Sequence, residues 1–319
     1  GDGIEAPEEL LHDADLAMYR SKRNRPQGHD IIDLRKMNLA GHQAGLAHGL
    51  PGAIERGELH LDYQPIVDTV DGRLSGVEAL LRWTHPNRGA VPPTVFIPFA
   101  EQSGQIIELG RWVLEQACSD RNLWQQQGAA EIGMSVNVSA HQFMSAGFAA
   151  TVSGVLERSG ADPGSLTLEV TESVLVRDEE RALVVLTELK TIGVNLALDD
   201  FGTGYSSLAY LNMLPIDIIK AIRNSSPHSA TSRAVRRSVN AIIGLAHNLG
   251  MKIVCEGVET VRQFDEVTRL GTDSCQGFYF AKPMRSSRVD ALIRDQAGAS
   301  NRRFQPAAQR VNATARIGH

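Results

Sequence analysis

The stretch Leu196–Leu208, LALDDFGTGYSSL, ends an apolar run on two adjacent aspartates, Asp199 and Asp200, and a glycine-rich turn follows at once. A short apolar run that stops at turn residues is typical of a buried strand in a parallel sheet. Like charges at the end of such a strand are costly unless cations or protons neutralise them. The stretch therefore predicts an α/β fold with a polar site where strands end.

Runs of the same kind alternate with helical patterns through residues 40–290. The predicted strands are Leu59–Val67, Leu74–Trp83, Ile132–Ser139, Ser165–Ser173, Val194–Phe201, Ile216–Ile222, Lys252–Val258 and Ser274–Phe280. The predicted helices are Pro98–Gln126, Gln142–Ser159, Glu179–Thr191, Ser206–Leu211, Ala230–Leu249 and Val261–Leu270, and several are followed by a glycine suited to end a helix, namely Gly160, Gly193, Gly250 and Gly271. Eight such units in about 250 residues predict a closed (β/α)8 barrel of the TIM type, with an open doubly wound sheet as the alternative.

Polar side chains interrupt seven of these strands, mostly near their carboxyl ends. They are Glu78, Asn137, Glu169, Asp199, Lys220, Glu256 and Gln276. In a barrel these ends converge on one face, where the active site lies. Five carboxylates, counting Asp200, would meet there with an amide oxygen, and one lysine and one arginine (Arg82) are too few to neutralise them. An all-oxygen set of this kind suits Mg²⁺ or Mn²⁺.

Plainer interpretations exist for each residue alone. A single acidic residue at a strand end is more often a helix cap or a solvated turn residue. Asp-Phe-Gly (200–202) also occurs as the magnesium-binding signature of protein kinases, but this chain has no His-Arg-Asp catalytic loop and no glycine-rich loop near its start. The combination of seven strands therefore carries the prediction, not any one motif.

Composition limits the classes of protein. Of the 319 residues, 42% are hydrophobic, which is ordinary for a globular protein. The formal charge is -5, so neither DNA, RNA nor an anionic membrane is expected as a partner. The three cysteines are far apart without a CxxC pair, which argues against a disulfide framework or a thiolate zinc site. No apolar run approaches the ~20 residues of a membrane helix, and no signal peptide is evident, so a cytoplasmic location is expected.

Several motifs together resemble one known family. They are YQPIVD (63–68), EALLR (78–82), HPNRGAVPPTVFIPFAE (85–101), NVS (137–139), EVTE (169–172), DDFGTGYSSL (199–208), EGVE (256–259) and QGFYFAKPM (276–284). In this order they resemble the EAL-domain cyclic-di-GMP phosphodiesterases across residues 41–290. The resemblance implies a TIM-type barrel whose first strand is antiparallel to the others. It also implies hydrolysis of cyclic di-GMP to linear pGpG through two Mg²⁺ or Mn²⁺ ions that activate water, and a homodimer formed through the barrel.

The resemblance also implies roles for individual residues. The first ion would be held by Glu78, Asn137, Glu169 and Asp199, and the second by Asp199, Asp200 and Glu256. Lys220 would assist the attacking water, and Glu172 would steady the loop after Asp200. Arg82, Gln64 and Gln276 would contact the substrate or support its site.

One position departs from the family pattern. Family members usually carry an aspartate two places after the lysine of the sixth strand, and this chain has Ile222 there, with Arg223 retained. The alternative function is therefore a catalytically impaired EAL domain that binds cyclic di-GMP as a receptor. An assay for pGpG separates the two.

The two ends differ from the central region. LLHDADLAMYRSKRNRPQGHDII, within residues 1–34, resembles the closing helix and strand of a GGDEF diguanylate cyclase domain, although a simple amphipathic helix would also explain it. Residues 35–295 are predicted to form the EAL domain, and the small, polar residues 296–319 a flexible tail. The chain is expected to be a piece of a longer sensor protein.

Overall fold

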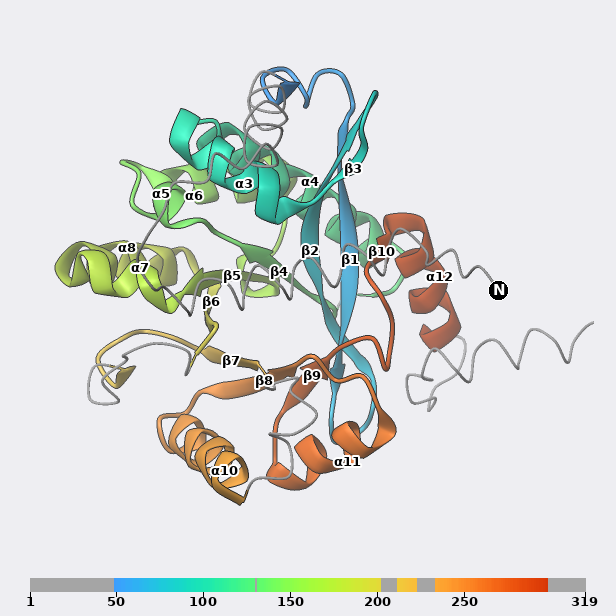
Figure 1. Ribbon diagram of the computed structural model, residues 1–319, viewed down its shortest axis with the longest axis vertical. Coiled ribbons are helices and arrows are strands. Elements are labelled where there is room, and N and C mark those ends of the chain that lie inside the picture. The colour runs from blue at the N-terminus through green and yellow to red at the C-terminus, as the bar shows by residue number, and fades with distance from the viewer. Residues whose placement is uncertain (1–48, 130, 202–210, 223–232, 298–319) are drawn as a thin grey trace, which may run out of the picture. The chain divides into compact units, whose positions relative to one another are not determined.

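The computed structural model describes residues 49–129, 131–201, 211–222 and 233–297, and these are organised around a closed barrel of β-strands (Figure 1). Its strands are β1 (Leu59–Asp68), β2 (Leu74–His85), β4 (Gly133–Asn137), β5 (Leu166–Thr171), β6 (Asn195–Asp199), β7 (Ile218–Ile222), β8 (Lys252–Glu256) and β9 (Ser274–Gln276). Two short strands, β3 (Gly89–Val91) and β10 (Met284–Arg285), pair with β2 and β1 beside the barrel. Each predicted strand corresponds to one barrel strand.

The barrel closes through β1. This strand pairs with β2 over the register Leu59↔Trp83 to Val67↔Leu74, and with β9 through Ile66↔Gln276. Both pairings are antiparallel, whereas the pairs from β2–β4 round to β8–β9 are all parallel. The TIM-type barrel and its antiparallel first strand are therefore confirmed, and the open doubly wound sheet is excluded.

Helices cover the outside of the barrel (Figure 1). The longer ones are α3 (Pro93–Ser103), α4 (Ile106–Gln126), α6 (Phe148–Ser159), α8 (Glu179–Ile192), α10 (Arg233–Asn248), α11 (Val261–Leu270) and α12 (Ser286–Ala297). Two short helices, α5 (Ala140–Phe143) and α7 (Glu172–Arg177), come after β4 and β5, and one turn of 3-10 helix, η1 (Pro163–Ser165), precedes β5. The helix α12 was not predicted, and it extends past the predicted domain boundary at residue 295.

Glycines set several helix ends, as the sequence predicted. Gly160, Gly193, Gly250 and Gly271 all have φ between 67° and 99°, a left-handed conformation that glycine adopts without a steric penalty. The same property makes the prediction of one helix over Pro98–Gln126 wrong. Gly104, with φ 77°, ends α3 after Ser103, and α4 begins separately at Ile106.

Two other predicted elements are shorter than expected. The helix predicted over Gln142–Ser159 is divided into α5 and α6, with Gly147 at φ 77° just before α6. The strand predicted over Ser274–Phe280 ends at Gln276, because the amides of Phe280 and Ala281 turn back to donate to the Gly277 carbonyl oxygen. The predicted helix Ser206–Leu211 lies, apart from its last residue, outside the described residues, as do residues 1–34 and 298–319.

The alternation of side chains along each strand separates an apolar layer from a polar one. In β4, Met134 and Val136 pack in the main hydrophobic core, which lies between the strands and the helices. Ser135 and Asn137 lie on the opposite parity, and Ser135 lines a cavity inside the barrel. TIM barrels usually fill this interior with bulky branched side chains. Here polar side chains stand among the branched ones that line the interior, and they place the candidate site.

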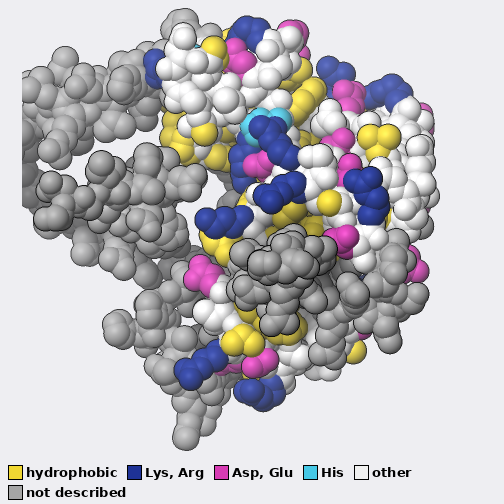
Figure 2. Space-filling view, turned by 90° about the vertical axis from the view of Figure 1, so that its right-hand side faces the viewer, with side chains coloured by type: hydrophobic (Ala, Val, Ile, Leu, Met, Phe, Trp, Pro, Cys, Tyr) yellow, Lys and Arg dark blue, Asp and Glu magenta, His cyan; other side chains and the backbone are white. Residues whose placement is uncertain are grey.

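The surface shows no single charge sign on the face turned toward the viewer in Figure 2, where basic and acidic side chains are intermixed. This agrees with the small net charge of -5. Among the described helices, none combines the length and the apolar composition that a bilayer-spanning segment requires.

Candidate active site

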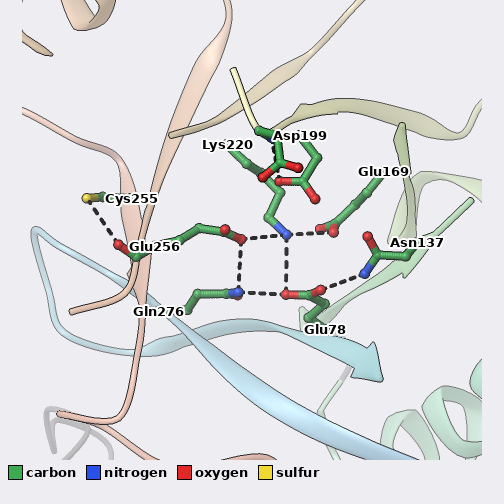
Figure 3. Close-up of polar contacts among 9 residues, drawn as sticks. Glu78, Asn137, Glu169, Asp199, Lys220, Cys255, Glu256 and Gln276 are labelled. Carbon is green, nitrogen blue, oxygen red and sulfur yellow. Dashed lines mark hydrogen bonds and ion pairs between the residues drawn. The ribbon is translucent and has the colours of Figure 1, made fainter. Parts of the chain in front are cut away.

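The parallel strands bring their polar residues to one end of the barrel. Asn137, Asp199, Glu256 and Gln276 are the last residues of β4, β6, β8 and β9, while Glu169 lies opposite Asn137 in the parallel register of β4 and β5. Figure 3 shows these side chains, with those of Glu78 and Lys220, pointing toward a common centre. The predicted convergence of residues far apart in the sequence is present.

Lys220 stands at that centre. Its ammonium nitrogen Nζ lies 2.6 Å from Glu169 Oε2, 2.7 Å from Glu256 Oε1 and 3.2 Å from Glu78 Oε2 (Figure 3). Lys220 and Glu169 are each only 1% exposed, and Glu78 is buried as well. The lysine of the apolar run IDIIKAI thus forms an ion-pair network with three glutamates from three other strands, and only Glu256 among them is partly exposed.

Two amide side chains hold the same carboxylates from the side. Gln276 donates from Nε2 to Glu78 Oε2 at 2.6 Å and to Glu256 Oε1 at 3.1 Å. Asn137 donates from Nδ2 to Glu78 Oε1 at 2.6 Å. Both oxygens of Glu78 are therefore engaged, so the orientation of this carboxylate is fixed from two sides.

The electrostatics show more negative charge than one lysine neutralises. Burial alone would raise the pKa of Glu78, but the charge of Lys220 and the hydrogen bonds from Gln276 and Asn137 outweigh it and lower that pKa. Burial raises the pKa of Glu169 to about 8, against the opposing effect of Lys220. Not all of the carboxylates are therefore ionised at neutral pH in the metal-free protein.

The pKa values of Glu256 and Lys220 are also shifted by burial and by neighbouring charges. Burial, with the charges of Asp199 and Glu78, raises the pKa of Glu256 to about 7 despite Lys220. Burial alone would lower the pKa of Lys220, but the surrounding carboxylates raise it well above its ordinary value, so this lysine stays charged. The single charge of Lys220 therefore leaves part of the negative charge of the cluster without a compensating cation.

The two adjacent aspartates are oriented by the backbone at the strand end. Asp200 has φ 57°, a left-handed conformation that aspartate tolerates better than most residues, and its amide donates to Asp199 Oδ1 at 2.8 Å. Burial and the charge of Asp199 raise the pKa of Asp200, while Lys220 lowers it. Adjacent side chains of an extended strand point to opposite faces. Because Asp200 leaves the extended conformation, its side chain and that of Asp199 can lie near the same group of residues.

The donor chemistry fits divalent cations. Glu78, Glu169, Asp199, Asp200, Glu256 and Asn137 offer only oxygen ligands, which Mg²⁺ and Mn²⁺ prefer. Glu169 Oε1 and Gln276 Oε1 are buried and have no hydrogen-bond partner among the described residues. Within the described part of the chain no group of three or more His, Cys, Asp or Glu side chains is already arranged as a metal site. Lys220 Nζ lies between the carboxylates instead.

Two predicted substrate-binding residues lie beside the cluster and not in it. Arg82 Nε lies 3.3 Å from Asp62 Oδ2, and both side chains are half-buried. Gln64 is buried and donates from Nε2 to the Ala281 carbonyl oxygen at 3.3 Å. The carboxylate partner of Arg82 is thus Asp62 on β1, and the predicted contact of Arg82 with the substrate stays a prediction.

Glu172, which was predicted to steady the loop after Asp200, is the first residue of α7, directly after β5. It is buried, and its Oε2 has no hydrogen-bond partner among the described residues. The loop that it is predicted to steady, residues 202–210, lies outside the described residues. Its role stays a prediction.

Asp62 is a residue that sequence reasoning missed. It pairs with Arg82 and also lies 3.6 Å from Arg285 Nε, so it ties β1 to β2 and β10. A signal was present, since Asp62 is a charged residue inside a predicted strand and lies on the face of Gln64 two residues later.

A cavity of about 500 Å³ adjoins the cluster between the strand ends and helices α3, α4 and α5. Asn137 and Arg82 line it on the cluster side, and Leu80, Ile97 and Leu109 supply apolar walls. A cavity of this volume, with apolar walls and polar groups among them, is typical of a small-molecule site.

The sequence is similar to one family model and to curated proteins of Pseudomonas aeruginosa. The sequence model described as the EAL domain matches residues 48–283. The bifunctional diguanylate cyclase/cyclic di-GMP phosphodiesterase MucR of Pseudomonas aeruginosa is 43% identical over 296 residues, covering 92% of this chain and 43% of MucR. The cyclic di-GMP phosphodiesterase NbdA of the same species is 35% identical, covering 90% of this chain and 37% of NbdA. The chain thus spans less than half the length of these curated relatives.

Two solved structures are similar to this chain in both sequence and fold. A structure titled "PaMucR Phosphodiesterase, c-di-GMP complex" is 44% identical with a TM-score of 0.74, covering 77% of this chain and 99% of that one. The EAL enzyme Bd1971 in its cAMP- and cyclic-di-GMP-bound form is 30% identical with a TM-score of 0.75, covering 91% of this chain and 76% of that one.

Proposed function

This chain belongs to the EAL-domain family, and from that membership we propose that it hydrolyses cyclic di-GMP to linear pGpG with the help of two divalent cations. The observation that carries the proposal is the group of Glu78, Glu169 and the partly exposed Glu256 around the buried Lys220, toward the carboxyl ends of the strands. The named activities of MucR and NbdA support it.

We assign the two ion sites as the family pattern implies. Glu78, Asn137, Glu169 and Asp199 would hold one ion, and Asp199, Asp200 and Glu256 the other. Two bound Mg²⁺ or Mn²⁺ ions would lower the pKa of water and offset negative charge on the reacting phosphate. The raised pKa values of Glu169 and Glu256 support this assignment, because they indicate carboxylates that lack sufficient positive charge.

The protein's own side chains supply orientation and charge. Gln276 and Asn137 fix Glu78 by hydrogen bonds, so this carboxylate keeps one direction. Lys220 stays protonated and adds a positive charge next to the attacking water and the phosphate. The reaction adds one water oxygen to phosphorus and releases the ribose 3′-oxygen as a hydroxyl, which leaves a 5′-phosphate on the linear product.

Substrate binding is assigned to the neighbouring surface. Arg82, held by Asp62, faces the cavity beside the cluster and would contact an anionic or guanine oxygen of the substrate. The apolar walls of that cavity would take one base. Gln64 and Gln276 would support the substrate from β1 and β9, and Glu172 would hold the loop that follows Asp200.

The alternative function is a receptor that binds cyclic di-GMP without cleaving it. Ile222 favours this alternative, because it replaces the usual aspartate and is the register partner of Glu256, an ion-site residue. A missing carboxylate there would weaken the second ion site. The presence of every assigned ligand favours the enzyme.

The decisive experiment incubates purified protein with Mg²⁺ and cyclic di-GMP and follows pGpG by chromatography. Hydrolysis is expected in Mg²⁺ or Mn²⁺, with weak or no turnover in Ca²⁺, which prefers longer bonds and looser coordination. Glu78→Ala is expected to abolish hydrolysis, while Glu188→Ala, at an exposed position of α8, serves as the matched control. Binding of cyclic di-GMP without product from the unmodified protein would establish the receptor instead.

A homodimer formed through the barrel is part of the proposal and rests on the family resemblance alone. Sedimentation velocity over a range of protein concentrations tests it. A single monomer species at every concentration would contradict it.

A further inference from the structure

A second cavity lies inside the barrel, on the opposite side of the cluster from the strand carboxyl ends. It has a volume of about 310 Å³. Exposed residues at the amino-terminal ends of the strands and in the preceding loops form its outer part, among them Glu131, Asp162 and Lys252. Its inner part reaches Glu169 and Lys220. The cavity therefore connects the amino-terminal end of the barrel with the underside of the candidate active site.

Small side chains keep this part of the barrel hollow. Gly76, Ser135, Thr167 and Ala197, from four consecutive strands, line the cavity where TIM barrels usually carry a layer of bulky branched residues. Ser135 and Thr167 are register partners in β4 and β5 and stand two residues before Asn137 and Glu169. They therefore lie one layer below these site residues.

The cavity is suited to water. Serine, threonine and charged side chains supply hydrogen-bond partners along it, and polar cavities of this size hold water whereas empty ones are apolar. At its inner end, the carboxylate of Glu169 is 1% exposed and its Oε1 has no hydrogen-bond partner among the described residues. The cavity therefore ends against a buried carboxylate of the candidate active site.

We propose that this cavity is a water-filled channel through which the reaction centre exchanges water and protons with solvent while substrate covers the carboxyl-end opening. The proposal rests on the proposed function. Each turnover consumes one water, whose oxygen joins phosphorus while one of its hydrogens ends on the released 3′-hydroxyl. The other hydrogen belongs to a phosphomonoester with a second pKa near 6, so about one proton leaves per turnover at pH 7.5.

The test fills the channel without touching a site residue. Thr167→Leu and Ser135→Leu each place an apolar side chain into the cavity, and Thr167→Val is the matched control because it removes the hydroxyl while keeping the volume. Crystal structures of the metal-free proteins would show whether ordered waters run from Lys252 to Glu169. We expect such waters in the unmodified protein and in Thr167→Val, and none at the plugged position in the two leucine variants.

Turnover gives the functional readout with two substrates. For cyclic di-GMP, kcat of the leucine variants is expected to fall about tenfold, equivalent to a barrier about 1.4 kcal/mol higher, with KM unchanged. For bis(p-nitrophenyl) phosphate, a small diester that leaves the carboxyl-end opening uncovered, kcat is expected to stay within about twofold of the unmodified rate.

Three results would overturn the channel: a dry cavity in the unmodified protein, full turnover of cyclic di-GMP by a variant whose waters are gone, or equal losses with both substrates. If the unmodified protein cleaves neither substrate, the proposed function fails. The positions of the waters then still decide whether the channel exists.

Discussion

Replacing Lys220 by methionine would test how the site is stabilised before any metal binds. Methionine keeps the length and apolar stem of the side chain but removes the ammonium group. Glu78, Glu169 and Glu256 would then share a buried space without their common cation, since all three contact Lys220 Nζ at 2.6 to 3.2 Å. The variant therefore isolates the charge at the centre of the cluster.

The magnitude follows from these distances. At an effective dielectric constant of about 20, each pair at roughly 3 Å is worth about 5 kcal/mol of attraction. Most of this is offset by the desolvation of the ions, and breaking a buried pair by removing one partner costs about 3–5 kcal/mol. Because a folded protein is stable by only about 5–15 kcal/mol, the loss is a large part of the total.

Urea unfolding in EDTA at pH 7.5 measures this free energy. Lys220→Met is expected to lose about 3–5 kcal/mol there and to recover stability at pH 5, where the glutamates can be protonated without large penalty. The matched control is Lys190→Met, which breaks the half-exposed Lys190–Asp217 pair at 2.8 Å and should cost about 1 kcal/mol or less. Equal losses for the two variants, or a Lys220→Met loss independent of pH, would refute the reasoning.

Three further predictions concern the same site and its neighbours. In the metal-free protein, the free energy of unfolding should fall as the pH rises from about 4.5 through 8, because the pKa of Glu169 is raised to about 8 in the folded state and stability is lost where the folded protein must release that proton. Glu169→Gln should flatten this pH profile in chemical unfolding experiments. An unchanged slope in that variant would contradict the role given to Glu169. Asp62→Asn should raise KM for cyclic di-GMP roughly tenfold with kcat nearly unchanged, because Arg82 loses its orienting carboxylate. Steady-state kinetics that show a fall in kcat alone would contradict this role of Asp62. Gly277→Ala should lower the unfolding free energy by more than about 2 kcal/mol in thermal or urea denaturation, since an added Cβ would lie 2.1 Å from the Val258 carbonyl oxygen, and unchanged stability would show that this turn relaxes freely.

Strand parity made most of the site predictable from the sequence. Polar residues in otherwise apolar strands, such as Asn137 and Glu169, have no stable place in a barrel except its interior or its rim. Once the barrel was inferred from alternation and length, their convergence followed. The glycine stops were predictable for a similar reason, because a left-handed residue at a helix end strongly favours glycine.

Partner choice was not predictable in the same way. Which carboxylates contact Lys220, and that Arg82 pairs with Asp62 instead of the cluster, depends on the closing β1–β2 register, and no local pattern encodes it. The antiparallel direction of β1 likewise came from the family resemblance, since periodicity along a single strand is the same in either direction. The division of the helix at Gly104 could have been found, because glycine within a helical pattern often ends it.

The most direct test of the central claim, that strand-end carboxylates hold a pair of divalent ions, is a Mn²⁺ titration of the protein followed by electron paramagnetic resonance. We expect two ions per chain with the spectrum of a coupled pair, and loss of that coupling in Asp199→Asn, where the shared ligand is removed. A single uncoupled ion, or a coupled spectrum that survives in Asp199→Asn, would contradict it.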